Sequence, residues 1–299
     1  MPKIDEKINR QQDMAQEAFE KLERLKAWIR EKGKIAIAFS GGVDSALLLK
    51  AACDALQGVE SHGGTDNADA AENKVLAITA DSRVFPGRER SESIEFCKSL
   101  NCRQILFRFD EMAVPGFADN PPDRCYICKT ALFTRMKAIA AENGMEVLAE
   151  GSNMDDLGDY RPGLRAIEEL RIASPLREAG LTKAEIRFLS RELGLPTWQK
   201  PSFACLASRF VYGEPITEDK PAMVEQGEQL LFSLGFHQFR VRIHGTLARI
   251  ELLPEELDRL LTPELRAEIA KKFRSFGFSY VTLDLQGYRT GSMNEGLKK

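Results

Sequence analysis

The sequence has 299 residues, of which 43% are hydrophobic and 29% charged, as in an ordinary globular protein of one large or two modest domains. Its 42 lysine and arginine residues against 45 aspartate and glutamate residues give a formal net charge of −3, which argues against a global basic surface for nucleic acid. No apolar run approaches the length of a membrane span, and no signal-peptide core is present. Six cysteines without an export signal indicate reduced thiols. We therefore expect a cytoplasmic protein.

Residues 1–200 alternate helical and strand patterns. Apolar residues near helical spacing predict a long N-terminal helix over residues 3–31. Short apolar runs predict strands at 34–39, 75–79, 104–109, 146–149 and 172–175. Helices are expected between and after these strands, at 43–56, 87–100, 128–143 and 183–193. Strands that alternate with helices predict an α/β fold with a doubly wound parallel sheet, which binds ligands at the carboxyl ends of its strands.

Two further regions depart from that alternation. Residues 57–73 are polar and glycine-rich, which predicts a surface insertion. From about residue 201 the order changes to helix, two strands, helix and strand. The ranges expected for these elements are 220–234, 238–243, 247–253, 254–276 and 280–285. We interpret residues 201–299 as a second, smaller α+β domain.

A glycine pair directly follows the first expected strand, in Ser40-Gly41-Gly42-Val43-Asp44-Ser45. Glycines let the backbone approach a ligand closely, and the helix that follows directs free N–H groups at the same point, so the segment suits a phosphate group. The spacing of a Walker A loop is absent. The motif instead resembles the PP-loop of ATP pyrophosphatases, enzymes that release pyrophosphate and leave AMP on a substrate. The alternative is a plain strand-to-helix turn with capping side chains.

Three cysteines form a second candidate site. Cys125 and Cys128 have Cys-x-x-Cys spacing where a proline-rich loop meets a helix expected to start at 128, and Cys205 lies within 201–209. A helix start favours the thiolate form. A structural zinc site normally has four protein ligands, and the sequence offers no clear fourth one, whereas three thiolates fit an iron–sulfur cluster with one open iron. The alternative is that these are ordinary cysteines, as we expect for the core residues Cys53, Cys97 and Cys102.

Several segments together resemble one family, LarE, the ATP-dependent sulfur transferases of nickel-pincer nucleotide cofactor synthesis. The resemblance covers nearly the whole chain, and its segments are 40–45, 151–163, 174–176, 181–187, 201–209, 239–242 and 283–289. The main departure is the insertion at 57–73. The resemblance implies a PP-loop domain with the N-terminal helix over residues 1–200 and a substrate and sulfur-transfer domain over residues 201–299.

The family's implied reaction starts from pyridinium-3,5-biscarboxylic acid mononucleotide. ATP adenylates a carboxylate, pyrophosphate leaves, and sulfur then replaces AMP to give a thiocarboxylate. The residues that the resemblance implies for ATP are Ser40, Gly41, Gly42, Asp44, Ser45, Ala80 and Lys183, with Asp44, Asp155 and Asp156 as candidates to hold Mg²⁺. Arg209, Arg240 and Arg242 would hold the phosphate or carboxylates of the substrate, for which the guanidinium fork is well shaped. A solvated lysine at 183 and surface salt bridges for the arginines are the alternatives.

The family uses two sources of sulfur. In one, a single cysteine at the position of Cys205 gives up its own sulfur and becomes dehydroalanine. In the other, three cysteines hold a 4Fe-4S cluster with an extra sulfide, and the presence of Cys125 and Cys128 favours this form. The partners expected are then the nucleotide substrate, sulfide or another sulfur donor, and further copies of the chain. A tRNA thiolase with a 4Fe-4S cluster and a non-catalytic metal or redox module remain as alternatives.

Overall fold

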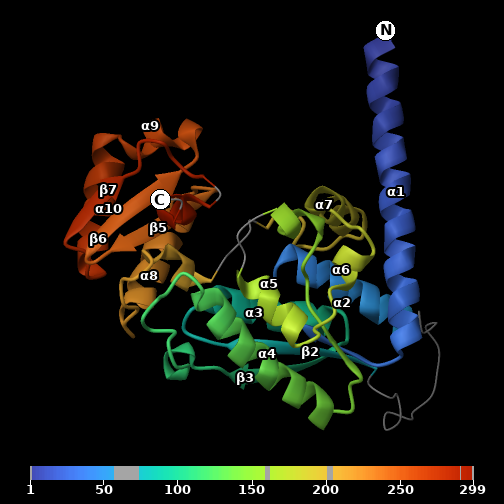
Figure 1. Ribbon diagram of the computed structural model, residues 1–299. Helices are drawn as coiled ribbons and strands as arrows, with labels where there is room; N and C mark the ends of the chain where they lie inside the picture. The colour runs from blue at the N-terminus through green and yellow to red at the C-terminus, as the bar shows by residue number, and fades with distance from the viewer. Residues whose placement is uncertain (1, 57–73, 159–161, 201–204, 290, 298–299) are drawn as a thin grey trace. The chain divides into compact units, whose positions relative to one another are not determined.

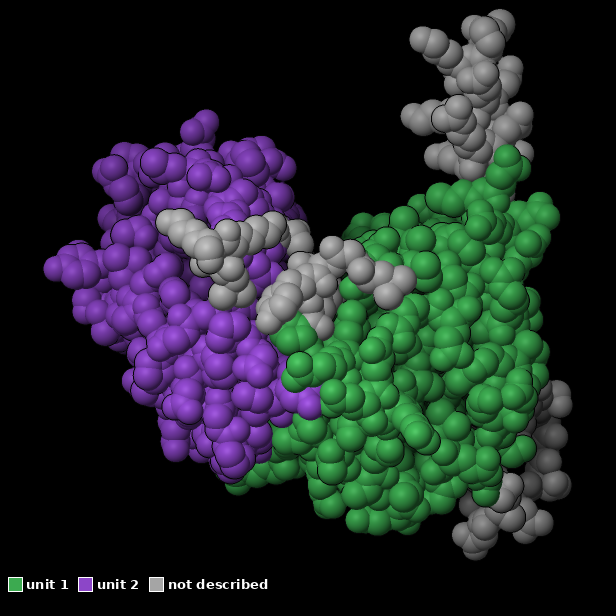
Figure 2. All heavy atoms as spheres, viewed as in Figure 1, with its two compact units in different colours: residues 1–81, 87–109, 129–202 green, residues 82–86, 110–128, 203–299 purple. Residues whose placement is uncertain are grey.

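The computed structural model describes residues 2–56, 74–158, 162–200, 205–289 and 291–297, with residues 2–12, 157, 158, 296 and 297 as backbone only. The insertion expected at 57–73 therefore lies outside the described residues, as do residues 201–204. The chain forms two compact units (Figure 2). Unit 1 comprises residues 1–81, 87–109 and 129–202, and unit 2 comprises residues 82–86, 110–128 and 203–299.

Unit 1 is built on a four-stranded sheet whose strands are all parallel. Its order is β3-β2-β1-β4. The strands are β1 (Ile35–Ala38), β2 (Val75–Asp81), β3 (Arg103–Arg108) and β4 (Val147–Ala149). The two central strands are apolar along most of their length, as expected when both faces of a parallel sheet are covered.

Helices cover both faces of this sheet (Figure 1). Ile35 and Ile37 pack in one core cluster, whereas Ala36 packs in another, because successive strand side chains point to opposite faces. The helices of the first face are α1 (Pro2–Lys32), α2 (Val43–Leu56), α3 (Gly87–Ser99), α6 (Pro175–Glu178) and α7 (Lys183–Glu192). Those of the second face are α4 (Arg124–Glu142), from residue 129 onward, and α5 (Pro162–Glu169). The predicted doubly wound α/β fold is confirmed.

Unit 2 contains a three-stranded mixed sheet of order β5-β6-β7. The antiparallel pair β5 (Phe239–His244) and β6 (Leu247–Leu252) is followed by β7 (Tyr280–Leu283), parallel to β6. Its helices are α8 (Lys220–Ser233), α9 (Leu257–Leu260) and α10 (Pro263–Ser275). A Cβ at Gly227 of α8 would lie 3.0 Å from the Phe273 ring, so a glycine here lets α8 and α10 approach closely.

Short 3₁₀ turns complete the chain. They are η1 (Glu111–Ala113), η2 (Met154–Gly158), η3 (Leu206–Arg209), η4 (Pro254–Glu256) and η5 (Ser292–Leu297). None of the described helices combines the length and the apolar composition that crossing a bilayer requires.

Three expected elements differ from the structure, each next to a proline. The strand at 172–175 is wrong: a single bridge joins Ala173 to Ala149, and Pro175 instead opens α6. The single helix at 254–276 is divided into η4, α9 and α10, and Pro263, which has no N–H to continue a helix, begins the last of them. Helix α4 begins at Arg124 rather than 128, two residues after Pro122, so both cysteines of the Cys-x-x-Cys motif are helical.

The core of unit 1 predicts a specific pattern of thiol reactivity. Cys53, Cys97 and Cys102 are buried, and burial raises the pKa of the Cys97 thiol to about 12, whereas Cys125 is exposed. In metal-free protein at pH 8, we expect iodoacetamide to modify Cys125 first and the three buried thiols at least about tenfold more slowly, through transient opening of the core. Peptide mass spectrometry measures the rates, and protein unfolded in urea is the control in which all six should react alike. Equal rates for Cys97 and Cys125 in the folded protein would contradict the packing of α3.

Candidate functional site

The glycine motif forms a tight turn between β1 and the first turn of α2. The Ser45 hydroxyl lies 3.1 Å from the Ser40 hydroxyl and donates to the Gly42 carbonyl oxygen at 3.2 Å. Gly41 has a φ of +75°, a conformation that side chains other than glycine rarely adopt. The turn lies at the carboxyl end of β1, and free N–H groups at the start of α2 are directed toward it. The geometry is that of a phosphate-binding loop.

Asp44, Asn153 and Lys183 come together beside this turn, although they are far apart in the sequence. The Lys183 ammonium is paired with the Asp44 carboxylate, and the Asn153 side-chain amide donates to the other Asp44 oxygen at 3.2 Å. Lys183 is the first residue of α7, where Thr182 and Glu185 form a capping box that fixes the helix start. The loop after β4 therefore presents an amide, and the start of α7 an ammonium group, to the two oxygens of the Asp44 carboxylate.

The two aspartates expected to hold Mg²⁺ have structural partners. The Asp155 carboxylate accepts a hydrogen bond from the Lys183 backbone N–H at 2.6 Å, and the Asp156 carboxylate accepts one from the Asn153 backbone N–H at 2.9 Å. Within the described ranges, no group of three or more His, Cys, Asp or Glu side chains is arranged to hold a single metal ion. The assignment of Mg²⁺ to Asp155 and Asp156 stays a prediction, and nucleotide phosphate oxygens would have to supply the remaining ligands.

A buried lysine that the sequence did not single out also contacts the turn. The Lys200 ammonium donates to the Gly41 carbonyl oxygen at 3.1 Å and pairs with Glu89 at 2.6 Å. Burial raises the pKa of Glu89, and Lys200 acts against that rise. Ala80, expected near the adenosine, is half-buried at the end of β2. In the sequence, the only feature that marks Lys200 is its position directly before the segment 201–209 that contains Cys205. That position alone does not predict a contact with Gly41.

The three candidate cysteines all belong to unit 2. Cys125 and Cys128 lie on the first turns of α4 at a spacing of three residues, which puts them on one face of the helix. Cys205 precedes η3, where the Leu206 N–H donates to the Val84 carbonyl oxygen at 2.9 Å. Cys128 and Cys205 pack against the same hydrophobic core. The structure therefore brings the Cys-x-x-Cys motif and Cys205 into one neighbourhood.

Burial disfavours the thiolate form of two of these cysteines, Cys128 and Cys205, in the metal-free protein. Burial raises the pKa of Cys205 to about 11, with a smaller contribution from the nearby Cys125, and Arg124 acts in the opposite direction. Burial also raises the pKa of Cys128, and a charge on Cys205 would raise it further. Metal binding here must release protons.

The arginines expected to hold substrate lie around a buried network. Arg209 is fully buried and makes two hydrogen bonds to Glu228, at 2.8 and 2.9 Å, and another to the Cys205 carbonyl oxygen at 3.2 Å. Arg242 makes two hydrogen bonds to Glu251, at 2.9 and 3.1 Å. Arg240 lies beside this network, close enough for the charges of Arg209 and Glu228 to act on it.

Arg240 differs from the other two arginines. Its guanidinium lies over the Tyr288 ring, 5.3 Å from the ring centre, and donates to the Phe239 carbonyl oxygen at 2.6 Å. Burial and the neighbouring Arg209 charge lower the pKa of Arg240 to about 10. Placing a buried cation next to other cations costs free energy, and a bound anion would offset that cost.

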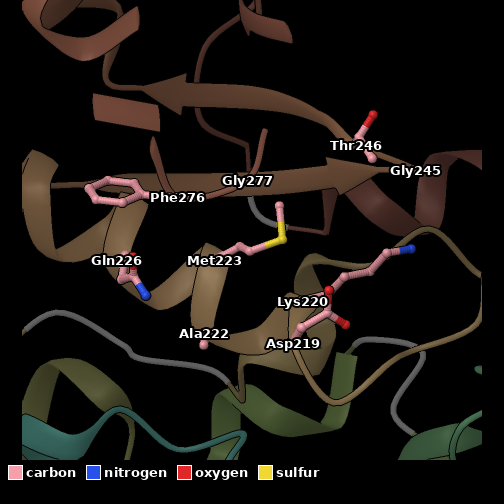
Figure 3. A pocket seen from close by; sticks show the side chains of 9 residues that line it. All are labelled: Asp219, Lys220, Ala222, Met223, Gln226, Gly245, Thr246, Phe276 and Gly277. Atoms are coloured by element: carbon pink, nitrogen blue, oxygen red, sulfur yellow. The ribbon is translucent and has the colours of Figure 1, made fainter. Parts of the chain in front are cut away.

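A pocket of about 370 Å³ lies elsewhere in unit 2, at the start of α8 (Figure 3). Met223 and Phe276 form its apolar part, and Asp219 and Lys220 form its polar part. It contains none of the residues that the sequence predicted for ATP, sulfur or substrate.

The chain was compared with known proteins. No family model matches the sequence. It is 37% identical, over 92% of its length and 94% of the relative's, to pyridinium-3,5-bisthiocarboxylic acid mononucleotide synthase of Lactiplantibacillus plantarum. It is 40% identical, over 93% of its length and 98% of the relative's, to the uncharacterized protein slr1717 of Synechocystis. Among solved structures, an NH3-dependent NAD synthetase of Campylobacter jejuni is similar at 15% identity and a TM-score of 0.45, over 87% of this chain and 95% of that one.

The match to the synthase extends over nearly the full length of both proteins and includes both units. The phosphate-binding turn and the grouped cysteines lie within it. The chain belongs to the LarE family of ATP-dependent sulfur-insertion enzymes.

Proposed function

We propose that this chain converts pyridinium-3,5-biscarboxylic acid mononucleotide into its thiocarboxylate form, by adenylating a carboxylate and replacing AMP with sulfur. The observation that carries the proposal is the 37% identity to a synthase of that product over 92% of the chain. The chemistry of the two candidate sites supports it, since one suits the phosphates of ATP and the other presents three thiols.

The ATP site supplies charge where the adenylation step needs it. A carboxylate is a poor electrophile, and its conversion to an acyl adenylate releases pyrophosphate, whose developing charge the N–H groups of the glycine turn would stabilise. The ion pair between Asp44 and Lys183 provides a ligand for the magnesium ion and a cation for the phosphates of Mg²⁺–ATP. The carboxylate would turn to Mg²⁺ and the ammonium to a phosphate oxygen.

We further propose that Cys125, Cys128 and Cys205 hold a 4Fe-4S cluster. Soft thiolates are the ligands that such clusters use, and here they come from two segments that pack on one core. A single zinc ion would need its sulfur ligands within about 4 Å of one another. In a cluster, each cysteine binds a different iron. The absence of a single-ion group among the described residues is therefore compatible with a cluster. When bound, the cluster would supply sulfur from its remaining iron without consuming a side chain.

The residues around these cysteines have supporting roles in the proposal. Arg240 and Arg242 would attract the phosphate or carboxylates of the nucleotide, since bidentate guanidinium contacts suit both groups. Arg209, which is fully buried, would act by fixing Glu228 and the Cys205 backbone. Sulfide or another sulfur donor would reload the cluster, and assembly into a homo-oligomer is part of the proposal.

The glycine turn is tested by Gly42→Val. A Cβ at Gly42 would meet only the Ser40 hydroxyl, at 3.5 Å, so the fold should tolerate the change while the valine fills the space for a phosphate. We expect pyrophosphate release to fall by about 100-fold or more, as when a hydrogen-bond donor to a developing anion is lost. Ala141→Val, on the exposed side of α4, is the control with the same new side chain. Wild-type release from Gly42→Val would contradict the phosphate-binding role.

The charge pair beside the turn is tested by Asp44→Asn. If Asp44 binds the magnesium of Mg²⁺–ATP, the variant should need at least about tenfold more Mg²⁺ for the same adenylation rate, because a carboxylate ligand is lost. The measurement is a Mg²⁺ titration of ATP–pyrophosphate exchange. Asp54→Asn is the matched control, since Asp54 lies on the same helix and also pairs with a lysine, at 2.5 Å from Lys50. Identical titrations for both variants would remove Asp44 from the magnesium site.

The sulfur source is tested by replacing each candidate cysteine. We expect Cys125→Ala, Cys128→Ala and Cys205→Ala each to lose both iron and sulfur transfer after anaerobic reconstitution, because three ligands hold one cluster. Cys97→Ala, a buried cysteine of unit 1, should keep its iron.

Mass spectrometry after turnover distinguishes the alternatives. Conversion of Cys205 to dehydroalanine, with an active Cys125→Ala variant for one round, would identify the sacrificial route. Repeated sulfur transfer by iron-free protein would exclude the cluster, and thiolation of tRNA in place of the mononucleotide would overturn the proposed substrate.

A further inference from the structure

A buried glutamate near the cysteines has no role in the reaction described so far. Glu111 opens the short turn η1 in unit 2 and is only 2% exposed. The turn is held in place because the Asp110 carboxylate accepts a hydrogen bond from the Met112 N–H at 3.1 Å. The backbone that carries Glu111 is therefore held by the turn, and the Glu111 side chain lies in the interior of unit 2.

Glu111 lacks the partners that other buried carboxylates of this unit have. Glu228 is paired with Arg209 and Glu251 with Arg242. Glu111 receives a hydrogen bond from the Ser82 hydroxyl, but its Oε1 has no hydrogen-bond partner among the described residues, and none of them pairs with it as a cation. An unsatisfied buried polar atom lowers the stability of the fold. Such an atom is expected where a ligand completes the site.

The carboxyl shares its surroundings with two of the cysteines. Met112, Cys128 and Cys205 pack against the same hydrophobic cluster. The Ser82 hydroxyl also accepts a hydrogen bond from the Val84 N–H at 3.2 Å, and the Val84 carbonyl oxygen accepts one from the Leu206 N–H at 2.9 Å. The donor to Glu111 is thus tied to the residue that follows Cys205.

We propose that Glu111 is the fourth protein ligand of the iron–sulfur cluster, and that its Oε1 binds the iron that no cysteine holds until sulfide displaces it. This inference rests on the proposed function. Three cysteines leave one iron without a protein ligand, and the carboxylate oxygen without a partner supplies the missing donor. Loading would then be a ligand exchange without electron transfer: the iron–oxygen bond breaks, hydrosulfide from the sulfur donor forms the iron–sulfur bond, and the carboxylate leaves as an anion.

The chemistry of the two ligands makes this exchange favourable. Carboxylate oxygen is a hard ligand and sulfide a soft one, so sulfide binds the iron of a cluster more strongly. A carboxylate in the empty state would protect the fourth iron from loss while leaving the position available. Removing it should have two opposite effects, a more labile iron and tighter binding of sulfide.

The test compares wild type with Glu111→Gln, Glu111→Ala and the control Asp119→Asn, an exposed carboxylate of the same loop. Each protein is reconstituted anaerobically, and iron and acid-labile sulfide are measured per chain. Loss of the fourth iron to a chelator is followed by electron paramagnetic resonance, and sulfide binding by absorption.

We expect all four proteins to assemble a cluster, because the three cysteines are intact. Both Glu111 variants should lose the fourth iron several-fold faster and bind sulfide about tenfold more tightly, since a competing ligand lowers the apparent affinity of wild type. The control should behave as wild type. Glutamine keeps the size of the side chain, so this variant tests the inference even if the alanine variant does not fold.

The outcomes separate the two levels of the proposal. Iron loss and sulfide affinity equal to wild type in Glu111→Gln would overturn the role of Glu111 and leave the cluster intact. Wild-type protein that assembles no cluster would overturn both, and the cysteine variants would then report on Cys205 alone.

Discussion

The proposed ATP site depends on one close approach between two loops. A Cβ at Gly151, just after β4, would lie 3.1 Å from the Ser45 backbone nitrogen and 3.2 Å from the Asp44 Cβ. Only glycine lets the loop after β4 lie this close to the phosphate-binding turn. The loop can then present Asn153 to Asp44, and through Asp155 it holds the start of α7, which carries Lys183. The positions of Asp44, Asp155 and Lys183 relative to one another follow from that contact and from the parallel order of the strands.

Unit 2 depends instead on charges that are paired away from water. The pairs Arg209–Glu228 and Arg242–Glu251 are buried, and loss of one partner from such a pair typically costs about 3–5 kcal/mol. Glu228 also accepts a hydrogen bond from the Val241 N–H at 3.1 Å, so the pair connects η3, α8 and β5. The same arginine that stabilises this unit therefore also holds the Cys205 backbone, so substitution of Arg209 would disturb folding together with the proposed sulfur transfer.

The sequence was sufficient where local chemistry decides the structure. Helix α2 has the predicted bounds, because a glycine turn precedes it and its apolar residues are continuous. The effect of prolines was underestimated, since Pro175 and Pro263 each begin a helix within the range of an expected element. Pairing between distant residues could not be inferred from pattern. The burial of Arg209 and the contact of Lys200 with Gly41 depend on segments that only the folded chain brings together.

Some of the residues predicted for the reaction lie in the sequence next to the points where the chain passes from one unit to the other. These passages lie after residues 81, 86, 109, 128 and 202. Ala80, Cys128 and Cys205 each lie within three residues of one of them, and so does Glu111, which no pattern indicated. Functional residues often occupy connections that a rigid scaffold positions. Ala80 is held by the sheet of unit 1, and Cys128 and Cys205 are held by the buried core of unit 2. The local geometry of these residues is therefore set by packing rather than by the composition of the connecting loops.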